Sequence, residues 1–94
     1  MIELNTLGII SKAGMGIIGI ENVKKYLKKL KIKKGFFILA KDASETTRKK
    51  ALFLKEKYNL PLIELGTKKE LAKFFKKEEV SFIYVKTRGF LKII

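Results

Sequence analysis

Apolar residues recur at helical spacing in several parts of the chain. The clearest stripe lies within residues 21–31, where Val23, Tyr26, Leu27 and Leu30 fall at i, i+3, i+4 and i+7. Lysines take most of the other positions in this segment, so the pattern predicts an amphipathic helix with a basic outer face. We expect further helices over residues 3–12, from the turn at 42–45 to Tyr58, from Thr67 to Phe75, and in a last turn within residues 87–94.

Continuous apolar runs predict the strands. "GFFILA" (35–40) is typical of a strand that is buried on both faces. "LIEL" (62–65) predicts a second strand and "VSFIYV" (80–85) a third core strand, and Ile17-Ile18 form a shorter extended piece between glycines. Helices and strands therefore alternate with short loops. This order predicts an α/β fold, a three-layer α/β/α sandwich around a small four-stranded mixed sheet, in which residues 1–94 form one domain.

Polar residues at two helix starts indicate how those helices are capped. Asp42 and Glu45 have the spacing of a capping box, with Ser44 as a competing N-cap for the same helix. Thr67 and Glu70 form a second capping box at the next helix. We also expect Asp42 to cap a neighbouring helix rather than to touch a ligand.

The composition excludes much of enzyme chemistry. The chain has no Cys and no His, which removes thiol chemistry, disulfides, typical zinc sites and His as a general base. We therefore expect a non-catalytic protein without a metal or a cofactor. No apolar run is long enough for a membrane span, and the start of the chain has an acid where a signal peptide carries basic residues, so we expect a cytoplasmic protein.

The charge points to a polyanionic partner. The formal net charge is +13 in 94 residues, which favours nucleic acid as the partner. The alternative without a binding function is that the many lysines reflect a compositional bias or form a solvated face. Their distribution argues for a binding surface, because seven of the eleven residues from Lys24 to Lys34 are lysines.

The stretch "AGMGIIGIENVKK" (13–25) allows more than one interpretation. Gly14, Gly16 and Gly19 match the GxGxxG spacing of a dinucleotide-binding turn, which needs a strand before Gly14 and an acid after the next strand. "TLGIISKA" (6–13) could be that strand, and Asp42 that acid. Against this, Ile17-Ile18 would have to lie within the phosphate loop, and the chain is short for a complete fold of that kind. The glycines could also serve only as turn residues, and the chain could be a ribosome-associated protein–protein module.

The same stretch resembles the opening of a known family. "LGIISKAGMGIIGIENVKKYL" is similar to the start of bacterial members of the kink-turn-binding ribosomal protein "L-seven-Ae / L-thirty-e" superfamily, which read LGLA, then AG, then a glycine and a helix. The resemblance continues through "ILAKDASETTRKK", "NLPLIELGTKKELAKFF" and "VSFIYVKTRGFLKII", and so covers nearly the whole chain. It implies an α/β/α sandwich that binds structured RNA, of the kink-turn type or ribosomal RNA.

The resemblance also implies a site. The family has a G-x-N-E-x-x-K-like motif where the second helix begins, and the matching positions here are Gly19, Glu21, Asn22 and Lys25, with the middle pair in the order Glu-Asn. An amide and a carboxylate both suit recognition of base edges. A second contact region in the family is the loop before the last strand, which here reads Lys77, Glu78, Glu79 and Val80, and its two acids would repel phosphates. The expected recognition edge is Gly19, Ile20, Glu21, Asn22, Lys25 and Val80, and the expected phosphate contacts are Lys12, Lys24, Lys28, Lys31, Lys33 and Lys34.

The aromatic residues are expected to pack the core rather than to stack on bases, because they lie in apolar runs. They are Phe36, Phe37, Phe74, Phe75, Phe82 and Tyr84.

Overall fold

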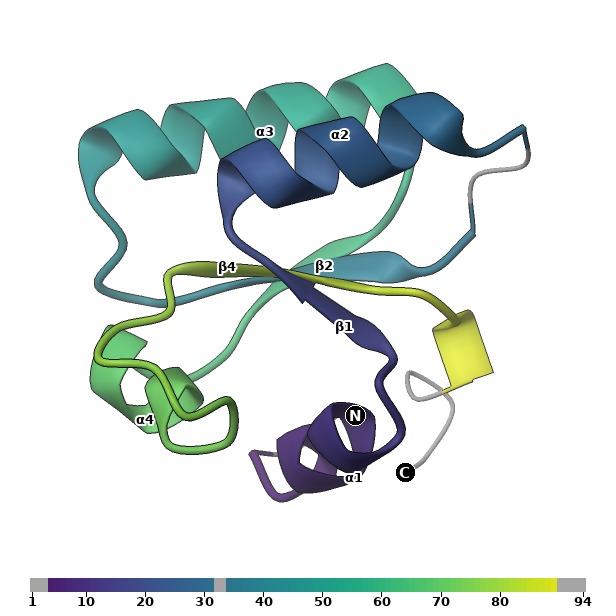
Figure 1. Cartoon of the computed structure of the whole chain (residues 1–94). Helices are drawn as coiled ribbons and strands as arrows, with labels where there is room; N and C mark the ends of the chain where they lie inside the picture. Colours follow the sequence, from purple (N-terminus) through teal and green to yellow (C-terminus); the bar gives the residue numbers. More distant parts are fainter. Residues whose placement is uncertain (1–3, 32–33, 90–94) are drawn as a thin grey trace.

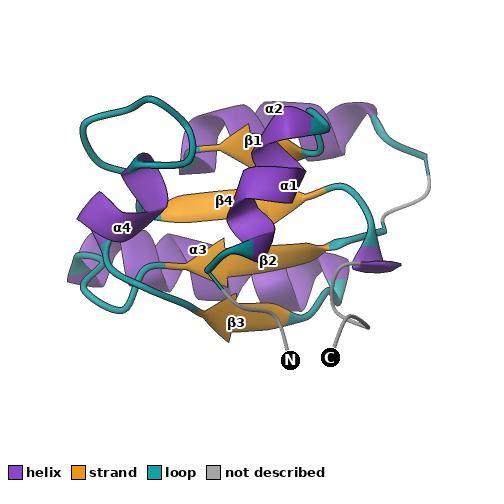
Figure 2. Cartoon of the chain, turned by 90° about the horizontal axis from the view of Figure 1, so that it is seen from below, coloured by secondary structure: helices purple, strands orange, loops and turns teal. Residues whose placement is uncertain are grey.

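Four strands form one mixed sheet in the order β1-β4-β2-β3. The computed structural model describes residues 4–31 and 34–89, and the strands are β1 (Gly16–Ile18), β2 (Phe36–Leu39), β3 (Leu62–Glu64) and β4 (Phe82–Val85). Strand β2 runs parallel to β3, and β4 runs antiparallel to both β1 and β2. Strand β4, the last strand within the described residues, therefore lies inside the sheet, while β1 and β3 form its edges (Figure 2).

The helices cover both faces of this sheet. Helices α2 (Ile20–Lys29) and α3 (Glu45–Tyr58) lie on one face, and α1 (Thr6–Lys12) and α4 (Lys68–Ala72) lie on the other (Figure 1). The predicted three-layer α/β/α sandwich around a four-stranded mixed sheet is thus confirmed.

The two inner strands supply a core on each face of the sheet. Successive strand residues point to opposite faces, so Phe36 and Ile38 of β2 pack with Leu7 and Ile10 of α1. Phe37 and Leu39 join the cluster on the other face. That second cluster includes Val23, Leu27, Ala51, Leu54, Phe82 and Tyr84.

The expected packing role of the aromatic residues is also confirmed. Phe36, Phe37, Phe82 and Tyr84 are at most 1% exposed. Phe74 and Phe75 are partly buried against the α1 side of the core. The rings of Phe36, Phe37, Phe82 and Tyr84 are therefore covered by the protein itself.

Several element boundaries differ from the expected ones. Helix α4 ends at Ala72 rather than Phe75, because the chain leaves the helix through a turn in which Lys76 has a φ of 55°. Strand β4 begins two residues later than expected, at Phe82. The last turn expected within residues 87–94 shows a 3₁₀ conformation at residues 88–89, and its remainder lies outside the described residues.

The helix caps correct one expectation and confirm another. Ser44, not Asp42, is the N-cap of α3, since its hydroxyl accepts a hydrogen bond from the Thr47 amide at 3.2 Å. The expected Asp42–Glu45 capping box is therefore wrong. The Thr67–Glu70 capping box at α4 is confirmed in both of its hydrogen bonds.

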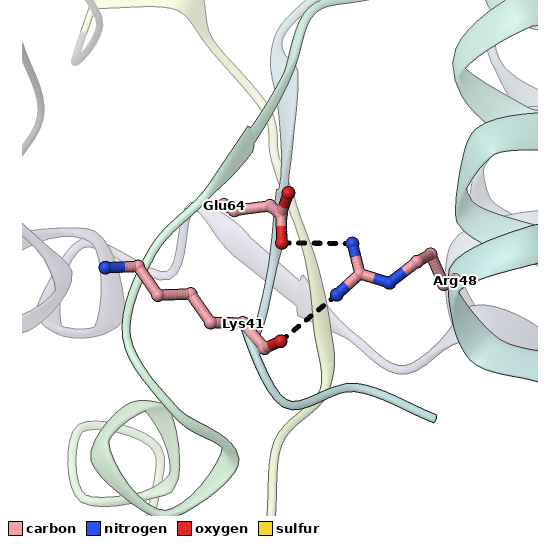
Figure 3. A network of polar contacts seen from close by, with 3 residues as sticks. All are labelled: Lys41, Arg48 and Glu64. Carbon is pink, nitrogen blue, oxygen red and sulfur yellow. Dashed lines mark hydrogen bonds and ion pairs between the residues drawn. The ribbon is translucent and has the colours of Figure 1, made fainter. Parts of the chain in front are cut away.

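A charged side chain of α3 connects that helix to two strands. The guanidinium of Arg48 donates to Oε1 of Glu64 in β3 at 3.0 Å and to the carbonyl of Lys41, after the end of β2, at 3.1 Å (Figure 3). Arg48 thereby bridges the parallel pair at the ends of both strands. A planar guanidinium with several donors suits such a double contact.

Tyr84 forms a contact at the opposite end of the sheet, where β2 begins. Its hydroxyl donates a hydrogen bond to the carbonyl of Lys34, and its ring lies 5.8 Å from that of Tyr26. Burial raises the pKa of the Tyr84 hydroxyl above its ordinary value of 10.0, and the neighbouring Tyr26 adds to this rise.

Candidate nucleic-acid interface

The junction of β1 and α2 places the start of α2 at one end of the sheet. Gly19 is the N-cap of α2, with φ 91° and ψ 143°, a backbone conformation that side chains rarely adopt. Its amide donates to the carbonyl of Phe82 at 2.9 Å, which anchors the junction to β4. A glycine at this position therefore lets the chain turn sharply from the sheet into the helix.

Three helices begin at this end of the sheet. Leu39 pairs with Phe82 at the end of β2, and Lys41 donates its amide to the carbonyl of Gly66 at 2.8 Å. The N-termini of α2, α3 and α4 follow directly from this region. Helix N-termini carry the positive end of the helix dipole. At α3 and α4, first-turn amides already donate to the side chains of Ser44, Thr67 and Asp42.

A pocket of about 420 Å³, here called the α2 pocket, opens beside the start of α2. It lies between the first turns of α2 and α3 and the segment that enters β4. Its lining residues are Ile18, Gly19, Ile20, Glu21, Asn22, Thr46, Thr47, Lys50, Glu79, Val80, Ser81 and Phe82.

The α2 pocket brings together most of the expected recognition edge. Gly19, Ile20, Glu21 and Asn22 line it from one side, and Val80 lines it from the other. The side chain of Val80 is 1% exposed and packs in the core, so it contributes to the floor of the pocket rather than to an open contact.

Charge in the α2 pocket is mixed. Glu21 and Glu79 bring two carboxylates, and Lys50 brings one cation. Glu21 also forms an ion pair with Lys24 at 3.7 Å, although its side chain stays 71% exposed. Such a lining suits recognition of polar groups better than the binding of bare phosphates, because nearby carboxylates repel phosphate.

Asn22 has a fixed orientation at the rim of this pocket. Its Nδ2 donates a hydrogen bond to the carbonyl of Ile18 at 3.0 Å, from the first turn of α2 back onto the edge strand. This bond uses one of the two N–H donors of the amide, so the other N–H and the acceptor Oδ1 remain for a ligand.

A second depression, here called the lysine groove, lies along β1 and has a volume of about 450 Å³. Lys25, the last residue of the expected motif, lines this groove and not the α2 pocket. Asn22 and Ile18 line both, so the two depressions are adjacent. The lining of the groove is Gly16, Ile17, Ile18, Asn22, Lys25, Tyr26, Lys29 and Lys77.

The expected phosphate contacts do not form one cluster. Lys24 pairs with Glu21 at the start of α2, whereas Lys31 and Lys34 lie beyond the other end of this helix, about 15 Å away for ten residues. Lys28 is exposed in the last turn of α2, and Lys12 lies in the last turn of α1, in the opposite layer. Lys33 lies outside the described residues.

The structure contradicts the dinucleotide interpretation of the glycines. The strand that this motif needs before Gly14 is helix α1 instead, and Ile17 and Ile18 belong to an edge strand rather than to a loop. Gly14, with a φ of 65°, does form a turn. Gly16 is not a turn residue but the first residue of β1, where a Cβ would come within 3.3 Å of Ile10 and Phe75 side-chain atoms.

Several lining residues were not among the expected contacts. Thr46, Thr47, Lys50 and Ser81 line the α2 pocket. Lys29 and Lys77 line the lysine groove; the sequence placed Lys29 in the lysine-rich segment and Lys77 in the second contact region, but neither was assigned a contact. The N-cap at Ser44 is the one sequence signal for part of this set, because it places the two threonines in the first turn of α3.

Metal-ligating clusters and membrane-spanning helices are both absent from the described residues. Within residues 4–31 and 34–89, no group of three or more acidic side chains is placed to hold a metal ion. No helix in the same ranges has the length and apolar character that crossing a membrane requires.

Comparisons with known proteins identify similar structures. No protein-family model matches the chain, and no curated protein matches it either. A Bacillus halodurans protein of unknown function has a similar structure, with a TM-score of 0.80 and 31% sequence identity over 93% of this chain and 86% of that one. A Giardia lamblia 15.5kD RNA-binding protein shares the fold, with a TM-score of 0.69 and 18% identity over 92% of this chain and 72% of that one.

Proposed function

We propose an RNA-binding function without catalysis for this chain, which belongs to the same family as the Bacillus halodurans protein of unknown function. The observation that carries the proposal is the α2 pocket, where Gly19, Ile20, Glu21 and Asn22 meet residues 79–82 of the segment before β4. These are the two regions that the resemblance to the kink-turn-binding superfamily implies for RNA contact. The net charge of +13 supports a polyanionic ligand.

The fold gives further support. The Giardia neighbour is an RNA-binding protein, and it shares the sandwich in which this pocket is built. Because its identity to this chain is 18%, it supports the architecture rather than any particular contact.

The chemistry of the pocket suits bases whose edges are accessible. The Oδ1 of Asn22 and the carboxylate of Glu21 are acceptors, and exocyclic amino groups of bases are donors. Sequence-specific RNA recognition mostly targets bases that are not in a regular helix. We therefore propose structured RNA of the kink-turn type, or a related element of ribosomal RNA, as the ligand.

A mobility-shift experiment tests the function. The probes are a kink-turn RNA and a plain duplex of equal length, each titrated with the protein at several salt concentrations. The wild-type protein is expected to bind in a salt-dependent manner and to prefer the kink-turn. If the wild-type protein shows no salt-dependent binding to either RNA, the proposed function is wrong.

Variants in the same experiment test the site. Asn22→Ala with Lys25→Ala is expected to remove the preference for the kink-turn. Asn5→Ala with Lys49→Ala is a matched control, because it removes one exposed asparagine and one exposed lysine that line neither depression. A double variant at 22 and 25 that keeps the full preference would exclude this site.

A further inference from the structure

We propose that the lysine groove holds the phosphate backbone of the RNA whose bases are read at the α2 pocket. This inference rests on the proposed function, because it takes RNA as the ligand, and it assigns phosphate contacts to Lys29 and Lys77, which were not among the expected contacts. It also divides the interface into two parts, an acceptor-rich pocket for base edges and a basic groove for phosphates.

The three cations of the groove come from two distant segments. Lys25 and Lys29 are four residues apart on α2, so they project from the same side of the helix. Lys77 lies in the segment between α4 and β4. The fold brings these side chains to one depression, whose remaining wall is formed by the edge strand β1.

The positive charges of the lysine groove are not neutralised by acidic residues in its lining. No acidic residue is among its lining residues, in contrast to the α2 pocket with its two carboxylates. Lys25, Lys29 and Lys77 are exposed, and none of the three forms an ion pair within residues 4–31 and 34–89. Cations that gather on a surface without partner acids raise the local potential and attract a polyanion.

The position of the groove favours the same RNA over a separate ligand. Asn22 and Ile18 line both depressions. An RNA strand that leaves the α2 pocket can therefore enter the lysine groove without crossing another helix or strand of the protein. Phosphate contacts fix the register of a nucleic acid, whereas base contacts provide its specificity. The two depressions offer these two kinds of contact side by side.

Two features argue against other occupants of the groove. An acidic peptide could pair with β1 as an added strand only through the backbone carbonyls of β1 that point away from β4. The Ile18 carbonyl already accepts a hydrogen bond from Asn22 at 3.0 Å. A stacked base would need a free aromatic face, but Tyr26 packs against Tyr84, and the Nζ of Lys86 lies 5.2 Å from the centre of its ring. Phosphate groups need neither.

The salt dependence of RNA binding tests the inference. The probes are the kink-turn RNA and the plain duplex, and the slope of log K against log salt is measured for each protein. The groove variant carries Lys29→Gln and Lys77→Gln, and the control carries Lys49→Gln and Lys57→Gln, which removes the same charge from the exposed side of α3. Circular dichroism melting of both variants checks that they are folded.

The groove variant is expected to lower the magnitude of the slope by about two, because each lost phosphate contact lowers it by roughly one. Its preference for the kink-turn over the duplex is expected to stay within about twofold of wild type, since phosphate contacts carry no sequence information. The control variant is expected to keep the wild-type slope.

The outcomes separate the inference from the proposed function. If the wild-type protein does not bind either RNA, both the inference and the proposed function are wrong. Wild-type binding with an unchanged slope in the groove variant, or with an equal decrease in the control, overturns the inference alone. A fluorescent poly-glutamate peptide is a third probe, titrated with the same proteins. If the groove variant keeps the RNA slope but loses binding to this peptide, the groove accepts an acidic peptide and the inference is overturned.

Discussion

The carboxylate of Asp42 accepts a hydrogen bond from the backbone amide of Lys68 at 2.8 Å. Lys68 is the first residue of α4, and Asp42 follows β2, so one side chain joins the end of an inner strand to the start of a helix in the next layer. A negative group at a helix N-terminus also interacts favourably with the helix dipole. Asp42 thus has a structural role at the end of the sheet where the α2 pocket lies.

This role predicts a loss of stability without a loss of RNA binding when Asp42 is removed. Asp42→Ala is expected to lower the free energy of unfolding by about 1 kcal/mol, since it leaves an amide of α4 uncapped. Glu45→Ala serves as the comparison and is expected to cost about 0.5 kcal/mol or less, through the dipole of α3 alone. Urea denaturation measures both. Equal losses in the two variants would contradict the assignment.

The bond between Asn22 and Ile18 predicts that aspartate cannot replace Asn22. In Asn22→Asp the donor to the Ile18 carbonyl is lost, and a carboxylate faces that carbonyl and lies beside Glu21. We expect a loss of about 1 kcal/mol in stability and weaker binding to kink-turn RNA than in Asn22→Ala. Calorimetric titration with the RNA compares the variants. If Asn22→Asp binds RNA as tightly as the wild-type protein, the orientation of Asn22 is not important for recognition.

Two glycines with positive φ are expected to respond differently to alanine. A Cβ on Gly35 would lie 2.0 Å from the carbonyl oxygen of Val85, whereas a Cβ on Gly14 would meet nothing within 4 Å. Gly14→Ala therefore carries only the cost of its left-handed backbone, roughly 1–2 kcal/mol. Gly35→Ala adds a backbone clash and is expected to cost more than about 4 kcal/mol. Thermal melting ranks the two, and a smaller effect at Gly35 would contradict the close approach to β4.

The raised pKa of Tyr84 predicts a loss of stability in alkali. The unfolded chain releases the Tyr84 proton near pH 10.0, whereas the folded chain holds it to higher pH. The unfolded state therefore binds fewer protons in this range, and stability decreases as pH rises above about 10. Tyr84→Phe removes this contribution, so its stability is expected to decrease less steeply between about pH 9 and 11. Denaturation series at each pH measure the difference, and parallel curves for the two proteins would contradict it.

Local patterns predicted the elements well because each depended on neighbouring residues. The stripe of Val23, Tyr26, Leu27 and Leu30 indicated α2, and the apolar runs at 35–40 and 80–85 indicated the two inner strands. The partner of Asp42 was not predictable in the same way. Glu45 had the spacing of a local partner, but the hydrogen bond goes to Lys68, which the fold brings close from a distant part of the chain.

The candidate site was predictable to a similar extent. Glu21 and Asn22 are adjacent to Gly19 in sequence, so their presence in one pocket followed from the helix that begins there. The resemblance placed Lys77 in a second contact region, but its proximity to Lys29 was not predictable, because it depends on the pairing of β1 with β4. Charge counts along the chain favoured the lysines after α2, which lie farther from the pocket.

The place of β4 inside the sheet has a consequence for biosynthesis. Gly16 near the start of the chain and Phe36 both pair with Val85, so neither β1 nor that side of β2 has its partner strand until residues 82–85 are available. Pairing across such a large sequence separation is slow compared with local helix formation. During translation, the sheet is therefore expected to stay incomplete until β4 has left the exit tunnel. Until then, the apolar face of the basic segment that becomes α2 lacks the strand β4 against which it packs.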